Sequence, residues 1–195
     1  MAKRLDTNAI NKTLSRNRAF KSEMRKKVTK TLESSQKRFL MDFKSHPVTR
    51  EIEGGPSAKN ISGTLGGYGN LFTFIGFVFG SDPTRVVERM ITDGISLGKV
   101  KKTSSTRNRI KVSVGINAPS KAAFFAATPL PFGGGRSWLY GIETGISGFG
   151  SYMYKKWNTS RSTQGIQTKT KIKSGSFRNT SYFSSMLLAF TKRIR

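Results

Sequence analysis

The stretch FKSEMRKKVTKTLESSQKRFLMDFKSHP, residues 20–47, decides how this chain begins to fold. Apolar side chains recur in and around it at steps near three, four or seven residues, the spacing that keeps them on one face of an α-helix. The apolar row of the first 45 residues consists of Ile10, Leu14, Phe20, Met24, Val28, Leu32, Phe39 and Phe43. A residue before proline is pushed out of the helical region, so His46-Pro47 ends the element. We therefore predict one amphipathic helix over residues 1–45.

The opposite face of this predicted helix is strongly cationic. Residues 1–45 hold 13 lysines and arginines against four acidic residues. A helix of nearly forty residues is about 55–60 Å long, which is more than a small domain can cover. We therefore expect residues 1–46 to form a basic arm, part of which projects and packs on another subunit.

The remaining residues, 47–195, are expected to form a single α+β domain with glycine-rich loops. Eight glycines fall within residues 48–80, and we predict a long ordered loop there. The apolar run LFTFIGFVF, residues 71–79, is expected to follow it as a buried strand. Asp82-Pro83 then opens a short helix that ends before Gly94.

The second half of this domain begins with a predicted hairpin of two strands, residues 95–102 and 109–117, joined by a polar turn. A short helix is expected over 118–128 and a strand over 137–144, whereas we predict no regular element for residues 145–165. Phe183, Leu187, Phe190 and Ile194 form the stripe of a C-terminal helix. The predicted fold class is α+β, with a long N-terminal helix, a central mostly antiparallel β-sheet and a C-terminal helix.

Composition excludes several classes of function. The chain has 195 residues, no cysteine and one histidine, so the usual zinc, copper, iron–sulfur, disulfide and thiol chemistries lack their residues. His46 is interpreted as a partly exposed residue at a helix end. We expect no enzyme and no cofactor. The N-terminus lacks the apolar core of a secretory signal, and residues 71–79 are too short to cross a bilayer, so no membrane partner is expected.

Two weaker patterns are interpreted as structural. GTLGGYGN, residues 63–70, lacks the Gly-Lys-Ser/Thr of a Walker loop and the glycine order of a dinucleotide fold. Glu51 and Glu53 would share one face of a strand beside Arg50, which we interpret as an ion-pair site at the surface.

Net charge is the property that most constrains the partners. Lysine and arginine number 35 against 10 acidic residues, a formal net charge of +25. Such a charge attracts phosphate without regard to sequence, so a cytoplasmic, sequence-nonspecific nucleic-acid-binding protein is one hypothesis. The other is an assembly component whose cationic faces dock on acidic neighbours. The candidate partner- or DNA-facing residues are Arg25, Lys26, Lys27, Lys30, Arg107, Arg109, Lys111, Trp138, Tyr152, Trp157, Lys169, Lys171 and Lys173.

Two short motifs and their order resemble a known family. Ser62-Gly63-Thr64-Leu65 is similar to a Thr-Gly-x-Leu loop that follows a helix, and Tyr140-Gly141-Ile142-Glu143-Thr144-Gly145 is similar to a later Tyr-x-x-x-Glu-x-Gly-Thr segment. Over residues 20–190 the chain resembles the neck and tail-completion (minor tail) proteins of long-tailed bacteriophages. It departs from them in a longer loop at 145–165 and a higher phenylalanine content.

The resemblance implies a non-enzymatic virion component of the phage neck or tail. Such a protein forms a ring homo-oligomer, typically hexameric, at the head–tail junction and joins the tail to the DNA-filled head. The implied partners are other copies of the chain, neck, connector and tail proteins with acidic faces, and DNA in the channel. The implied locations are the virion and, during assembly, the cytoplasm of the bacterial host.

Overall fold

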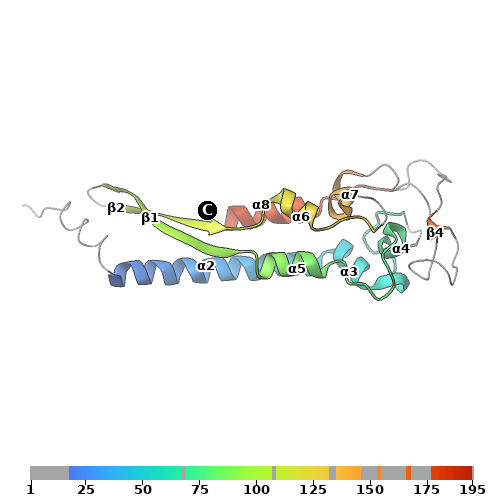
Figure 1. Ribbon diagram of the computed structural model, residues 1–195, viewed down its shortest axis with the longest axis horizontal. Helices are drawn as coiled ribbons and strands as arrows, with labels where there is room; N and C mark the ends of the chain where they lie inside the picture. The colour runs from blue at the N-terminus through green and yellow to red at the C-terminus, as the bar shows by residue number, and fades with distance from the viewer. Residues whose placement is uncertain are drawn as a thin grey trace, which may run out of the picture.

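The structure, a computed structural model, describes residues 18–66, 69–106, 109–131, 135–145, 153–154, 166–167 and 177–194. The predicted α+β class is confirmed: a long N-terminal helix and a C-terminal helix accompany a two-stranded antiparallel sheet. Figure 1 shows an elongated molecule in which helix α2 (Arg18–Ser45) runs along one side. Helix α8 (Phe183–Arg193) packs against α2.

Helix α2 confirms the predicted N-terminal helix over residues 18–45, whereas residues 1–17 of that prediction lie outside the described part. The helix ends at Ser45, as the following proline predicts. His46 is extended (φ −66°, ψ 136°), and its Nδ1 accepts a hydrogen bond of 3.2 Å from the backbone N–H of Val48. Proline then occupies the first turn of α3 (Pro47–Glu53), where a backbone N–H would have no acceptor within the helix.

The two halves of α2 differ in their surroundings. In the C-terminal half, Leu32, Phe39 and Phe43 are buried, and the Phe39 ring stacks on Phe190 of α8 at 5.2 Å. In the N-terminal half no residue from 18 to 31 is buried. Figure 1 shows this half extending beyond the core, as the length of the predicted helix requires.

The predicted strand at 71–79 is wrong. A 3-10 turn, η1 (Gly55–Ser57), and a loop lead instead into helix α4 (Leu71–Ile75), all of whose residues are buried. Asn70 caps this helix, because its side chain accepts a hydrogen bond of 2.9 Å from the backbone N–H of Thr73. Gly76 ends it in the left-handed conformation at φ 82°. Two local caps therefore decide the structure of an apolar run whose hydrophobicity suits either a helix or a strand.

Helix α5 (Arg85–Thr92) and the predicted hairpin follow. The helix begins two residues later than predicted, with Thr84 rather than Asp82 as its N-cap, although Asp82 Oδ1 still accepts a hydrogen bond of 3.1 Å from the backbone N–H of Arg85. Strands β1 (Ser96–Thr106) and β2 (Arg109–Asn117) pair antiparallel with two register shifts, and β1 runs four residues further than predicted. The base of this hairpin reaches the core through Leu97 and Ile116. Figure 1 shows its far end projecting from the same end of the molecule as the start of α2.

Helix α6 (Lys121–Ala126) matches the predicted short helix, but the predicted strand at 137–144 is wrong. That segment is helix α7 (Trp138–Thr144), because Ser137 accepts a hydrogen bond of 3.1 Å from the backbone N–H of Tyr140 and caps it. The described sheet is therefore smaller than predicted. It consists of the hairpin alone, and a separate two-stranded antiparallel sheet is formed by β3 (Met153–Tyr154) and β4 (Ile166–Gln167).

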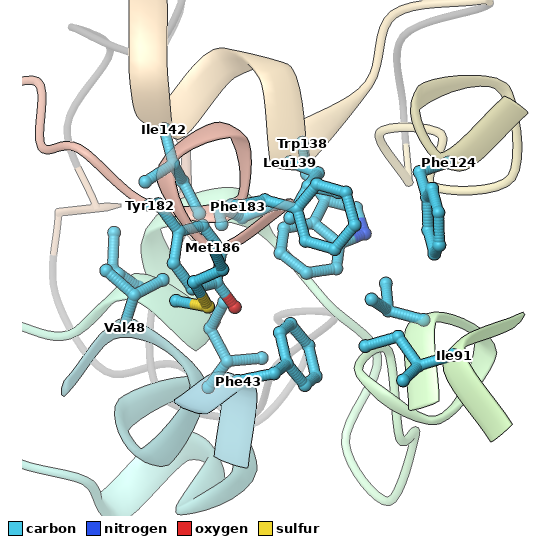
Figure 2. Close-up of a cluster of buried hydrophobic side chains, with 14 of the residues drawn as sticks. Phe43, Val48, Ile91, Phe124, Trp138, Leu139, Ile142, Tyr182, Phe183 and Met186 are labelled. Atoms are coloured by element: carbon cyan, nitrogen blue, oxygen red, sulfur yellow. The ribbon is translucent and has the colours of Figure 1, made fainter. Parts of the chain in front are cut away.

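The core lies where α2 to α8 meet, and Figure 2 shows its aromatic centre. The Phe183 ring lies 4.5 Å from that of Phe124 and 5.7 Å from that of Phe39. Tyr182 is fully buried beside them, and burial raises the pKa of its phenol strongly. Its hydroxyl is satisfied by Thr49 Oγ1 at 2.6 Å. The predicted C-terminal helix, α8, is thus confirmed and supplies much of the core.

Candidate functional site

The two motifs that carry the family resemblance meet on one segment of the chain. The backbone N–H of Arg178 donates a hydrogen bond of 2.7 Å to the carbonyl of Thr64, in the first motif. Two residues later, Thr180 donates one of 3.2 Å to the carbonyl of Ile142, in the second motif. Residues 178–180 therefore join the loop that holds Thr64 to helix α7, about eighty positions further along the sequence.

Each motif is also organised by one glutamate. Glu51 is completely buried, and its carboxylate accepts hydrogen bonds from Asn60 Nδ2 at 2.8 Å, from Leu71 N at 2.7 Å and from Ser62 N at 2.9 Å. The predicted surface ion-pair site is therefore wrong for Glu51, which lies on a helix and points into the protein. The two carboxylate oxygens of Glu51 hold the loop between α3 and α4 in place by these hydrogen bonds, so the role of Glu51 is structural.

Glu143 does the same for the second motif. Its carboxylate accepts hydrogen bonds from the backbone N–H and the hydroxyl of Ser184, in the first turn of α8. An acidic side chain at a helix N-terminus satisfies a free N–H and suits the helix dipole. Two of the ten acidic residues thus fix the fold of the segments that resemble the phage proteins.

Glu53 lies near the surface in a different environment. Its Oε1 accepts a hydrogen bond of 3.2 Å from the Thr84 hydroxyl, and Glu88 beside it pairs with Lys44 at 3.2 Å. Burial is the main cause that raises the pKa of Glu53, and the nearby Glu88 charge adds to it, whereas the Thr84 hydrogen bond lowers it. Within the described residues, no three carboxylate, histidine or cysteine side chains are placed to hold a metal ion.

The single histidine is a structural cap, as its interpretation as a helix-end residue predicts. His46 is half-buried, and its ring lies 4.7 Å from that of Tyr182. Burial lowers the pKa of His46, while its hydrogen bond with the backbone of Ser181 raises it. Nδ1 accepts from Val48, so the imidazole is neutral at that nitrogen.

The candidate residues other than Trp138 fall into three groups. Arg25, Lys26, Lys27 and Lys30 are exposed on the projecting half of α2. Arg109 and Lys111 belong to strand β2 of the hairpin. The structure therefore brings these two groups to one end of the molecule (Figure 1). The third group lies outside the described residues and consists of Arg107, Tyr152, Trp157, Lys169, Lys171 and Lys173.

Trp138 is not a partner-facing residue, so that prediction is wrong. Its side chain is 2% exposed and meets Phe77 edge to face at 5.7 Å, since α7 turns this side of the segment into the core (Figure 2). Its neighbour Tyr140 is 45% exposed and is the described aromatic of this segment that a partner can reach.

Exposed apolar side chains occur where the sequence indicated core. Val78 and Phe79 are 53% and 63% exposed in the turn after α4, although they belong to the predicted buried strand. The flanking glycines, Gly76 and Gly80, both have positive φ and were the available signal for a turn here.

None of the described helices is both long enough and apolar enough to cross a membrane. Comparison of the chain with models of known protein families, with curated proteins and with solved structures found no match in any of the three.

Proposed function

We propose that this chain is a non-enzymatic virion structural protein, a neck or tail-completion protein that forms a ring at the head–tail junction of a long-tailed bacteriophage. There it would join the tail to the DNA-filled head. The observation that carries the proposal is the pair of arms at one end of the molecule. These arms are the N-terminal half of α2, residues 18–31, and the part of the β1–β2 hairpin beyond Leu97 and Ile116 (Figure 1). The motif resemblance at residues 62–65 and 140–145 gives the class of assembly.

Extended arms of this kind gain stability from neighbours. A short helix without tertiary contacts is marginal in water, and so is an isolated two-stranded hairpin. Phe20, Met24 and Val28 on the helical arm are only half-buried and do not belong to the core cluster. Packing of the arms in an assembly would bury this apolar surface.

Charge sets a condition on that packing. A chain with a net charge of +25 repels its own copies, so like subunits meet more easily when acidic proteins or DNA neutralise them. In a ring every subunit uses a heterologous interface, in which two different faces meet. We propose acidic neck, connector or tail proteins as the neighbours, in the virion and in the host cytoplasm during assembly.

The polar side chains that make several hydrogen bonds in the described residues have structural roles. Glu51, Glu143 and His46 each hold a loop or cap a helix. This assignment of roles supports a protein without catalytic function.

Electron microscopy of the purified full chain at physiological salt, and of particles that contain it, tests the proposal. The expected result is a closed ring of identical subunits, which is also seen at the neck or tail end of particles. A protein that stays strictly monomeric and is absent from virions contradicts it.

A further inference from the structure

The helical arm carries far more positive charge than the rest of α2. Residues 18–31 contain only one acidic side chain, Glu23, which is exposed. All six basic side chains of the arm are exposed, and none of them takes part in an ion pair within the described residues. These six are Arg18, Lys21, Arg25, Lys26, Lys27 and Lys30.

The six cations lie on two sides of the helix. At 3.6 residues per turn, successive side chains are rotated by about 100°. Arg18, Lys21 and Arg25 therefore point in roughly the direction that the core-facing side chains of α2 take further along. Lys26, Lys27 and Lys30 point to the opposite side. Because all six of these side chains are exposed, the cations on both sides are accessible.

The hairpin arm adds charge of the same sign at the same end of the molecule. Strands β1 and β2 contain no acidic residue and five basic ones, namely Lys99, Lys101, Lys102, Arg109 and Lys111. Strand β1 contacts α2 near the core, and both arms extend from there in the same direction (Figure 1). The two arms together therefore form one end of the molecule with a strong positive potential.

The exposed cations of the arms suit a phosphate backbone, whereas the half-buried apolar row of Phe20, Met24 and Val28 suits a protein neighbour. The centre of a protein interface is depleted in lysine and depends on aromatic or apolar anchors. The exposed large apolar side chains of the described residues lie elsewhere: Met41, Ile61, Val78, Phe79, Tyr140 and Leu188. A phosphodiester backbone binds cations at suitable spacing, and the release of its condensed counterions favours the binding.

Shape selects between kinds of nucleic acid. An α-helix with its side chains is about 10–12 Å across, and the major groove of B-form DNA is about 12 Å wide. Cations on two opposite sides of a helix in that groove reach the phosphates of both strands. The major groove of A-form RNA is too deep and narrow for this arrangement.

We propose that the two arms bind the backbone of double-stranded DNA, with the N-terminal half of α2 in or along the major groove and the hairpin on adjacent phosphates. The interaction is independent of sequence, because charge carries it. The proposal goes beyond ring formation and does not rest on it, since a single chain presents both arms.

The test measures binding of the full chain to a fluorescently labelled 30-bp DNA duplex by anisotropy, between 50 and 200 mM NaCl. The arm variant is K26Q/K27Q/K30Q. The control variant, K59Q/K121Q/K192Q, removes the same net charge from exposed lysines outside the arms. Glutamine keeps helix propensity, and equal urea midpoints of the three proteins establish that all are folded.

For wild type we expect log K to fall linearly with log salt concentration. The arm variant should bind at least tenfold more weakly at 100 mM NaCl, with a slope shallower by about two to three units, since each lost phosphate contact lowers the slope by about one. The control should bind within about threefold of wild type. An RNA duplex of the same sequence should bind several-fold more weakly than the DNA.

Three results would overturn the proposal. The first is no binding of wild type at 50 mM NaCl. The second is an equal loss in the arm and control variants, which would make the attraction a property of total charge. The third is competition by polyglutamate as effective, per charge, as competition by DNA, which would identify the partner as an acidic protein. Because ring formation is measured separately by microscopy, either proposal can fail alone.

Discussion

The carboxylate of Glu51, on α3, accepts a hydrogen bond of 2.7 Å from the backbone N–H of Leu71, the first residue of α4. This contact spans twenty residues and closes the glycine-rich loop between the two helices. The same carboxylate holds Asn60 and Ser62 inside the loop. The buried Glu51 carboxylate therefore supplies hydrogen-bond acceptors to the N–H groups of this segment, which in a sheet would come from a neighbouring strand.

Replacement of Glu51 should destabilise the protein strongly. In Glu51→Gln one of the two carboxylate oxygens becomes an NH₂ group, which faces a donor instead of accepting from it. Hydrogen bonds to charged groups contribute about 1.5–3 kcal/mol each, so we expect a loss of about 2–4 kcal/mol in the free energy of unfolding. Urea denaturation measures it. The control, Glu33→Gln on the exposed face of α2, should change it by less than about 0.5 kcal/mol. Equal effects of the two substitutions would argue against the loop-closing role.

The Tyr182 hydroxyl and the Thr49 hydroxyl form a buried pair at 2.6 Å. Tyr182→Phe leaves the Thr49 hydroxyl buried without this partner, and we expect a loss of about 1–3 kcal/mol. In the double variant with Thr49→Val both polar groups are gone, so part of that stability should return. A double-mutant cycle from urea denaturation gives the coupling energy. Purely additive effects would mean that the two groups do not interact.

Stability should decrease as the pH falls from 7 to 5, with a contribution from His46. Burial lowers the pKa of His46 in the folded protein below its ordinary value of 6.5. The unfolded chain therefore binds its proton at higher pH than the folded chain, and the stabilising contribution is complete above pH 6.5 and is lost as the pH falls toward the folded pKa. His46→Asn keeps a side-chain oxygen for the cap and removes this titration.

The measurement is the free energy of unfolding of wild type and His46→Asn at several pH values. The difference between the two proteins cancels other groups, including Glu53, whose raised pKa acts with the opposite sign. Wild type should lose stability relative to the variant as the pH falls. Parallel curves between pH 7 and 5 would show that His46 keeps its ordinary pKa on folding.

Gly76 tests the structure of the apolar run directly. In the left-handed conformation at φ 82° an L-residue is disfavoured by about 1–2 kcal/mol, so Gly76→Ala should destabilise by about 1 kcal/mol after the gain from a stiffer unfolded chain. Gly115→Ala, in β2 and with room for a Cβ, is the control and should be close to neutral. If residues 71–79 formed a strand, Gly76→Ala would be neutral as well.

The sequence predicts the elements whose pattern is long and regular. The row that includes Leu32, Phe39 and Phe43 repeats over many turns, and the alternation from Ile110 to Ile116 is nearly complete. The described part of α2 therefore ends at the predicted residue, and β2 has its predicted bounds. The short apolar segments are different. Residues 71–75 and 138–144 are helices because Asn70 and Ser137 cap them, and hydrophobicity alone does not distinguish such helices from strands.

The candidate site was predictable in part for a related reason. The exposed cations of α2 follow from helical periodicity, because its apolar face is clear. The roles of Glu51 and Trp138 depend on contacts with residues that are distant in sequence, such as Leu71 and Phe77. No local pattern contains that information, so the sequence predicts a surface position for the buried carboxylate and a partner-facing position for the buried indole.

The central claim, that this chain is a subunit of a closed ring, is tested most directly by its native mass at physiological salt. Native mass spectrometry or mass photometry of the purified 21.6 kDa chain should give one dominant species at a whole multiple of that mass, about 130 kDa for a hexamer. A single species at 21.6 kDa, unchanged when acidic partner proteins or DNA are added, would contradict it.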